Sequence, residues 1–239
     1  MAITLVQKNG SASTGTLDAT PPAWSSTTTA GNLLIIVGCE VNCTNATWPT
    51  APSGYTAFTS NAFTFYAAGI VGVYGGYYKI AAGSDATPGH YGETTGTQDW
   101  VTYTYEFNNP LNWKSPQADQ ECHTAASSTQ VTSQVSANTG TLAQSQELAI
   151  LISAHDVAVT AESYTNSFTV DRPGTSNGKL WFGWKETSVT TALNSTASWT
   201  TLARVGVKIF TFKTVVPDPL MMTYPSRPAA QIAQIGSVL

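Results

Sequence analysis

Few residues in this chain have both the type and the spacing that catalysis requires. The histidines are His90, His123 and His155, and His155 precedes Asp156 just after an apolar run. A serine hydrolase needs a nucleophile, a base and an orienting acid in matched geometry, and the sequence has no Gly-x-Ser-x-Gly elbow. We therefore expect His155 to be a loop residue hydrogen-bonded to its neighbour, and we expect no enzymatic activity.

Carboxylates are the second kind of candidate. Glycoside hydrolysis needs two of them about 5 to 9 Å apart, and the 14 acidic residues are scattered along the chain. Glu106, on the polar face of an expected strand, is the most suggestive, but the sequence marks no partner for it. A β-sandwich hydrolase is therefore our third hypothesis. It depends on two carboxylates at catalytic spacing inside a cleft.

Cysteine and histidine could together bind a metal. Cys39 and Cys43 are close in sequence, and Cys122 precedes His123. Structural zinc sites usually use tighter cysteine pairs and a second such pair, so we expect small buried or surface thiols instead. The sequence also lacks a phosphate-binding glycine loop and a calcium loop. We expect no cofactor and no metal.

Aromatic side chains could bind sugars. The chain has seven tryptophans and ten tyrosines, and exposed rings beside polar groups would form a glycan platform. Trp181 and Trp184 have odd spacing in one expected strand, so their side chains should face opposite sides. Core packing explains most aromatic residues in a sandwich of this size, and a bound glycan stays open as an alternative.

The composition indicates which elements must position these residues. The chain has 239 residues, of which only 10 % are charged, and its formal net charge is -4. Abundant Thr, Val and aromatic residues favour strands, while Gly, Pro, Asn and Ser favour turns, so the fold class should be all-β. Without a basic cluster, direct binding of nucleic acid is not expected.

No membrane association or secretion is expected either. The most apolar stretch, Ala67 to Tyr78, is shorter than the roughly 20 apolar residues of a membrane span. The sequence begins like a strand and shows no apolar signal core. We therefore expect the chain to be made in the cytoplasm of its host.

Expected strands recur between turn signals, and the two halves of the chain carry similar motifs in the same order. The expected strands are 3–7, 33–39, 55–59, 70–80, 100–107, 129–135, 148–153, 167–170, 180–184 and 205–213. The matched motifs are 31–37 with 146–152, 54–56 with 163–165, 77–79 with 183–185, and 100–107 with 205–212.

Two similar four-stranded halves would bury their apolar strands by packing into one two-sheet sandwich. A jelly-roll or related Greek-key order is expected for residues 1–214. Two separate sandwiches joined near 108–117 are the alternative. The runs 33–37 and 148–152 argue against it, because both need cover on two faces.

The character of the chain changes after Lys213. Four prolines lie between residues 217 and 228, and proline fixes φ and removes a donor, so this segment cannot join a central sheet. Residues 215–239 are expected to form an extended, Pro-rich C-terminal arm that binds a partner. Its expected contact residues are Pro217, Leu220, Met221, Met222, Tyr224, Pro228, Ile232 and Ile235.

Several of these motifs resemble a known family. Thr-Ala-Gly-Asn-Leu-Leu-Ile-Ile-Val-Gly-Cys (29–39) is followed by Pro-Ser-Gly-Tyr-Thr (52–56), Tyr-Tyr-Lys-Ile-Ala-Ala-Gly (77–83) and Tyr-Glu-Phe (105–107). Lys-Ile-Phe-Thr-Phe-Lys (208–213) ends the second half. Together they resemble β-sandwich virion structural proteins of tailed bacteriophages, over about residues 29 to 213. The resemblance carries no catalytic residues.

The leading hypothesis is a capsid decoration, or cement, subunit located in the virion. It would bind the major capsid protein or other virion subunits through a sheet edge and the arm. We expect a homo-oligomer, a trimer by analogy with proteins that sit on local threefold axes. The alternative is a tail-associated receptor- or glycan-binding module, which exposed Trp or Tyr in one loop cluster would support.

Overall fold

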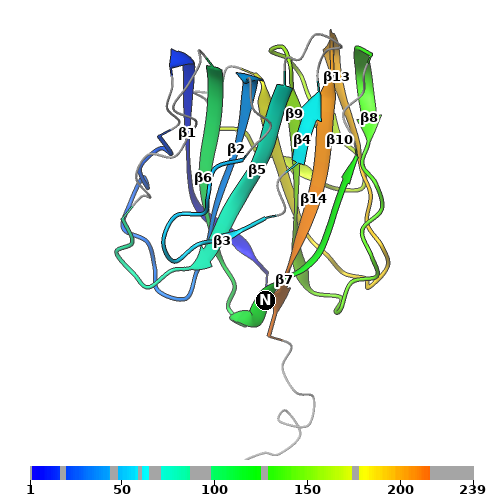
Figure 1. Ribbon diagram of the computed structural model, residues 1–239. Coiled ribbons are helices and arrows are strands. Elements are labelled where there is room, and N and C mark those ends of the chain that lie inside the picture. The colour runs from blue at the N-terminus through cyan, green and yellow to red at the C-terminus, as the bar shows by residue number, and fades with distance from the viewer. Residues whose placement is uncertain are drawn as a thin grey trace, which may run out of the picture.

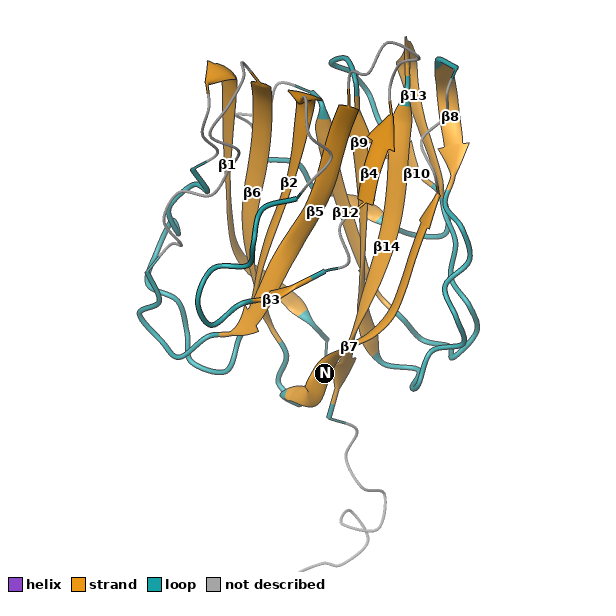
Figure 2. Cartoon of the chain, viewed as in Figure 1, coloured by secondary structure: helices purple, strands orange, loops and turns teal. Residues whose placement is uncertain are grey.

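The computed structural model describes residues 2–16, 20–43, 48–58, 61–64, 71–86, 98–124, 129–173 and 178–215. Every regular element in these residues is a strand (Figures 1 and 2), which confirms the expected all-β class. Among the described residues there is also no helix that could cross a membrane. The strands are β1 (Thr4–Thr16), β2 (Leu33–Cys43), β3 (Thr56–Ala57), β4 (Asn61–Thr64), β5 (Val71–Ile80), β6 (Gln98–Asn108), β7 (Trp113–Thr124), β8 (Val131–Val135), β9 (Glu147–His155), β10 (Ser163–Tyr164), β11 (Thr169–Val170), β12 (Leu180–Glu186), β13 (Thr196–Ala203) and β14 (Val205–Thr214).

The strands form two large antiparallel sheets and one small sheet. The first large sheet has the order β1-β6-β2-β5-β3, with β4 also paired to β5, and the second has the order β11-β12-β9-β14-β7. Each path holds five strands rather than the expected four, because β1 and β7 extend the two sheets. Each large sheet draws its strands from one half of the chain (Figure 1), and the jelly-roll order is not confirmed.

The main core lies between the two large sheets, and both halves contribute to it. Ile35 and Val37 of β2 pack there with Ile150 and Ile152 of β9. The expected alternation of β6 is confirmed, since its inward side chains also join this core: Val101, Tyr103, Tyr105 and Phe107.

The outer faces of the central strands are covered as well. The small sheet, β10-β13-β8, packs on the outer face of the second large sheet, where Leu151 and Trp199 share a second core. Trp48 and Trp100 cover Ile36 on the outer face of the first sheet. This double cover explains why both β2 and β9 have continuous apolar runs rather than alternating patterns.

The repeat expected from the sequence is present in the strand register. Ile35 of β2 lies opposite Tyr105 of β6 and Tyr78 of β5. Ile150 of β9 lies opposite Phe210 of β14 and Trp184 of β12. Three of the four matched motifs therefore occupy equivalent places in the two sheets.

The fourth motif match was wrong. Thr56–Ala57 pairs with Tyr78 and Tyr77, and the equivalent position beside β12 is taken by Thr169–Val170. Residues 163–165 lie elsewhere, because Ser163–Tyr164 forms β10 against β13 of the small sheet. The shared Tyr-Thr letters thus belong to different structural positions.

Equivalent aromatic contacts between the two large sheets occur twice, with the roles of the sheets exchanged. Phe107 of β6 meets Trp184 of β12 edge-on, with ring centroids 5.4 Å apart and planes at 69°. Phe212 of β14 meets Tyr78 of β5 edge-on, at 5.2 Å and 72°. Because these pairs are equivalent, exchanging the halves reproduces the packing. An approximate two-fold axis therefore relates the two sheets, with β2 and β9 at its centre.

Candidate functional site

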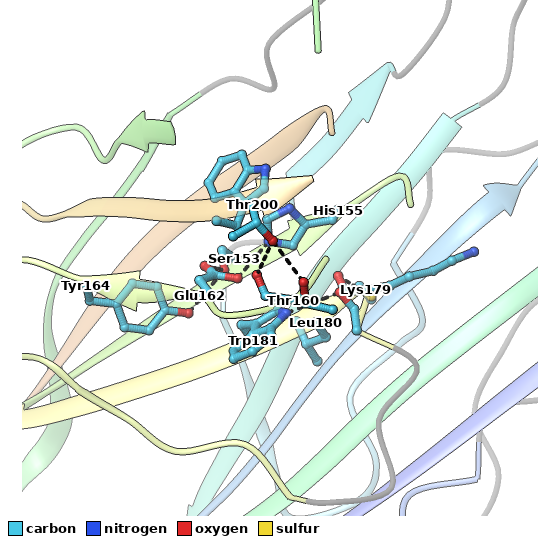
Figure 3. Close-up of polar contacts among 12 residues, drawn as sticks. Ser153, His155, Thr160, Glu162, Tyr164, Lys179, Leu180, Trp181 and Thr200 are labelled. Carbon is cyan, nitrogen blue, oxygen red and sulfur yellow. Dashed lines mark hydrogen bonds and ion pairs between the residues drawn. The ribbon is translucent and has the colours of Figure 1, made fainter. Parts of the chain in front are cut away.

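A buried polar cluster lies between the second large sheet and the small sheet (Figure 3). Ser153 and His155 point to the same face of β9 because they are two residues apart. Glu162, from the loop after β9, accepts hydrogen bonds from both: Ser153 Oγ donates to Oε1, and His155 Nε2 lies 2.9 Å from Oε2. Tyr164 OH lies 3.1 Å from Ser153 Oγ.

The pKa of Tyr164 sets the direction of the hydrogen bonds in this cluster. Burial raises the pKa of Tyr164 well above its ordinary value, and the neighbouring Glu162 carboxylate raises it further. Tyr164 therefore stays protonated. Its hydroxyl donates a hydrogen bond to Ser153 Oγ, and the Ser153 hydroxyl in turn donates a hydrogen bond to Glu162. The cluster links β9, the loop before β10, and β10 itself.

The arrangement does not match a serine hydrolase, although it contains a serine, a histidine and an acid. In such an enzyme the histidine stands between the nucleophile and the acid so that it can take the hydroxyl proton. Here the carboxylate of Glu162 stands between Ser153 and His155 (Figure 3). Both Ser153 and His155 are fully buried, so a substrate could not reach the hydroxyl.

The expected hydrogen bond between His155 and its sequence neighbour is also wrong. His155 is the last residue of β9 and packs edge-on against Trp199, with ring centroids 4.7 Å apart. Asp156 instead accepts hydrogen bonds from the backbone N–H and the guanidinium of Arg204, at 2.8 and 3.1 Å. Strand β9 extends to His155 and buries the imidazole. The small and polar residues after Ile152 do not predict this extension.

Glu106 is fully buried and acts as an anchor for the loop before β2. Its Oε1 accepts hydrogen bonds from Thr29 N at 2.8 Å and from Asn32 Nδ2 at 2.6 Å. Its Oε2 accepts a hydrogen bond from Gln7 Nε2 of β1. Gln7 in turn accepts a hydrogen bond from Ser26 N at 2.8 Å. Three donors thus satisfy the buried carboxylate, and these hydrogen bonds explain why a carboxyl group can be buried on this strand face.

A second buried carboxylate lies in the other large sheet, at the place that corresponds to Asn32 rather than to Glu106. Glu147, the first residue of β9, is fully buried and accepts a hydrogen bond from Gln144 N at 3.2 Å. Burial, together with the charge of Asp119 on β7, raises the pKa of Glu147 to about 7. Asp119 accepts a hydrogen bond from Ala143 N at 2.8 Å, and its Oδ1 lies 3.9 Å from Lys213 Nζ.

This pair does not fit the hydrolase hypothesis. Glu147 is fully buried, so a glycoside substrate could not reach its carboxyl group. Burial and the nearby negative charge of Asp119 disfavour the ionised form of Glu147. No local pattern links these two residues, because Asp119 lies on β7 and Glu147 on β9.

A cavity of about 130 Å³ opens beside Asp119, between β3 and β7. It is lined by the aromatic rings of Phe58, Tyr78, Phe210 and Phe212. Sites for small-molecule ligands usually measure about 300 to 1,000 Å³. The cavity is therefore too small for such a ligand but large enough for one apolar side chain.

The cysteines whose side chains are described lie in separate cores. Cys39 joins the core between the large sheets, and its Sγ is 3.7 Å from Lys179 O. Cys122 joins the core under the small sheet, and its Sγ donates to Ala137 O at 3.0 Å. Burial raises the pKa of the Cys122 thiol to about 11. In the described part of the chain, no group of three or more His, Cys, Asp or Glu could hold a metal.

The aromatic residues mostly form core. All seven tryptophans are described: five are buried, and Trp24 and Trp184 are half-buried. Trp181 and Trp184 face opposite sides of β12 as expected, the first toward the small sheet and the second toward the main core. None of the described tyrosines is exposed; Tyr66, Tyr91 and Tyr224 lie outside the described residues.

The residues expected to bind a partner cannot be placed in this fold. All of them lie outside the described residues, which end at Val215: Pro217, Leu220, Met221, Met222, Tyr224, Pro228, Ile232 and Ile235. The boundary between sandwich and arm at residue 214 also stays a prediction. Comparison of the chain with protein-family models, with curated proteins and with solved structures finds no match.

Proposed function

We propose that the chain is a non-enzymatic structural subunit of a bacteriophage virion, and specifically a capsid decoration protein that stabilises the shell through protein–protein contacts. The observation that carries this proposal is the state of the polar clusters. Glu106, Glu162 and Glu147 are each buried and hydrogen-bonded to groups that lie far apart along the chain or in adjoining loops. Their chemistry is used to fix loops and sheets, as in a rigid building block.

The surface that such a block offers for assembly is its sheet edges. In the described part of the chain, β1 and β7 end the two large sheets and each pairs with one neighbour. An edge strand can bind a partner by adding a strand from it. Lys8 on β1 and Pro116 on β7 are the kinds of residue that prevent uncontrolled edge pairing. The major capsid protein or another virion subunit is the proposed partner, in the virion.

Particle binding tests this proposal directly. Phage particles purified on a density gradient should contain the chain by mass spectrometry. Particles from a strain that lacks the gene should recover the purified full-length chain by co-sedimentation. We expect particles that have bound the added chain to resist heat better than particles that lack it. Absence of the chain from purified particles, or no co-sedimentation, would contradict the proposal.

Two matched variants locate the shell contact. Val6 of β1 and Val189 of a loop are equally exposed, at 47 % and 48 %. If β1 is the contact edge, Val6→Asp should weaken particle binding at least tenfold, whereas Val189→Asp should leave it unchanged. The glycan-binding alternative has less support, because none of the described tryptophans and tyrosines forms an exposed platform.

A further inference from the structure

The approximate two-fold axis makes the two sides of the sandwich comparable, and they differ in how they are closed. On the side formed by β1 and β11, Lys8 of β1 forms an ion pair with Asp171, the residue after β11. Tyr105 OH also donates to Asp171 O at 2.7 Å. These contacts join the two sheets at that edge.

The equivalent side, formed by β7 and β3, cannot close in this way. Phe210 of β14 is the equivalent of Tyr105 of β6. Lys8 lies opposite Tyr105, and Glu121 of β7 lies opposite Phe210. Glu121 therefore takes the place of Lys8. Phe58 takes the place of Asp171: its N–H donates to Gly76 O at 2.9 Å, as that of Asp171 donates to Phe182 O at 2.8 Å. An acid and a phenyl ring form no ion pair, and the cavity of about 130 Å³ lies between them.

The groups around this cavity define what it can bind. Phe58 stacks on Phe210 with ring centroids 3.9 Å apart, and these rings form an apolar floor. The acidic groups at the rim are matched by cations: Glu121 pairs with Lys208, and Lys213 lies beside Asp119. The cavity therefore favours an uncharged, apolar side chain rather than an ion.

We propose that this cavity binds one apolar side chain from residues 217–228 of a second copy of the chain. Twenty-four residues follow Val215, and residues 217–228 hold most of their large apolar side chains: Leu220, Met221, Met222 and Tyr224. Proline-rich segments dock into aromatic-lined grooves because their extended backbone loses little entropy on binding. The segment 216–239 contains one acidic and one basic residue, Asp218 and Arg227, and this neutral balance matches the rim.

The direction of β14 favours a second copy over the same chain. The strand passes the cavity at Phe210 and Phe212 and ends at Thr214, where Val215 N donates to Asn112 O at 2.9 Å. Pro217 and Pro219 favour extended backbone for themselves and for the residues before them. Leu220, the first leucine of the segment, follows Phe212 by eight residues in the sequence.

The methionine content of the chain provides a clean test. The three methionines are Met1, Met221 and Met222, so replacing methionine with photo-methionine labels mainly the proposed docking segment. Full-length chain of normal and heavy isotope composition is mixed, irradiated and digested for mass spectrometry. We expect cross-links from residues 221–222 to residues 57–58, 118–121 or 210–212, joining normal to heavy copies. Cross-links only within one copy, or only to other surfaces, would overturn the proposal.

Three full-length variants complete the test by sedimentation equilibrium. Ala57 and Ala12 are both exposed alanines on edge strands of the first sheet, and only Ala57 lines the cavity. Ala57→Trp should raise the dissociation constant for self-association at least tenfold and remove the cross-links, while Ala12→Trp should change neither. The triple variant L220D/M221D/M222D should match Ala57→Trp without altering the sandwich.

Equal behaviour of the two tryptophan variants, or unchanged self-association of the triple variant, would overturn the docking site. This site would serve the proposed virion subunit. Its test requires only the isolated chain, however, so failure of shell binding and failure of self-association are separate results.

Discussion

The raised pKa of Glu147 predicts a specific pH dependence of stability. The pKa of Glu147 rises from its ordinary 4.5 to about 7 on folding. Between these values the folded chain holds a proton that the unfolded chain has released, so the free energy of unfolding falls as pH rises. A shift of this size corresponds to about 3 kcal/mol, at about 1.4 kcal/mol per pH unit. The stabilisation is complete below pH 4.5 and is lost as pH rises through 7.

Glu147→Gln should remove this dependence, because the amide keeps the shape of the side chain and does not titrate. Urea denaturation at pH 5, 6, 7 and 8 measures the free energy of unfolding for both proteins. The variant should lose less stability than wild type between pH 5 and 8, by a difference of about 2 to 3 kcal/mol.

Glu186→Gln, a partly buried carboxyl on β12, is the matched control and should follow wild type. Parallel pH profiles for wild type and Glu147→Gln would refute the reasoning, since Glu147 would then not hold the proton.

Three further outcomes are expected. Gly76→Ala should destabilise the chain by about 3 kcal/mol in urea, because a Cβ there would lie 2.8 Å from the Phe58 ring and even closer to a backbone carbonyl; a loss below about 1 kcal/mol would show that the neighbours move easily. Glu106→Ala should cost about 3 kcal/mol and speed proteolysis of residues 20–32, because it leaves buried donors without an acceptor; an unchanged cleavage rate would contradict the anchoring role. A fluorophosphonate probe should not label the native chain at Ser153, and labelling abolished by Ser153→Ala would contradict the assignment of that cluster as structural.

Local patterns predicted the central strands because their side chains report burial directly. The continuous apolar runs in β2 and β9 and the alternation in β6 follow from cover on two faces or one. The edge strand β7 was missed because it contains Pro116 and many polar residues, and a strand with one neighbour tolerates both. β13 was missed as well, since half of its side chains are polar and partly exposed.

The polar clusters could not be predicted because their partners are distant in sequence. Glu106 was singled out from its strand face, but its donors Asn32 and Gln7 lie 74 and 99 residues away. Glu162 and Asp119 carry no local pattern at all. Only the pairing of strands brings such groups together, and no periodicity encodes that pairing.

The approximate two-fold axis has a consequence for the origin of the molecule. Two surfaces that match each other when exchanged are the mark of an isologous homodimer. A gene duplication that joined two such subunits into one polypeptide would produce this fold. Fusion also frees the two formerly identical edges to evolve apart. The two edges do differ: one has the ion pair between Lys8 and Asp171, and the other has Phe58 beside a cavity.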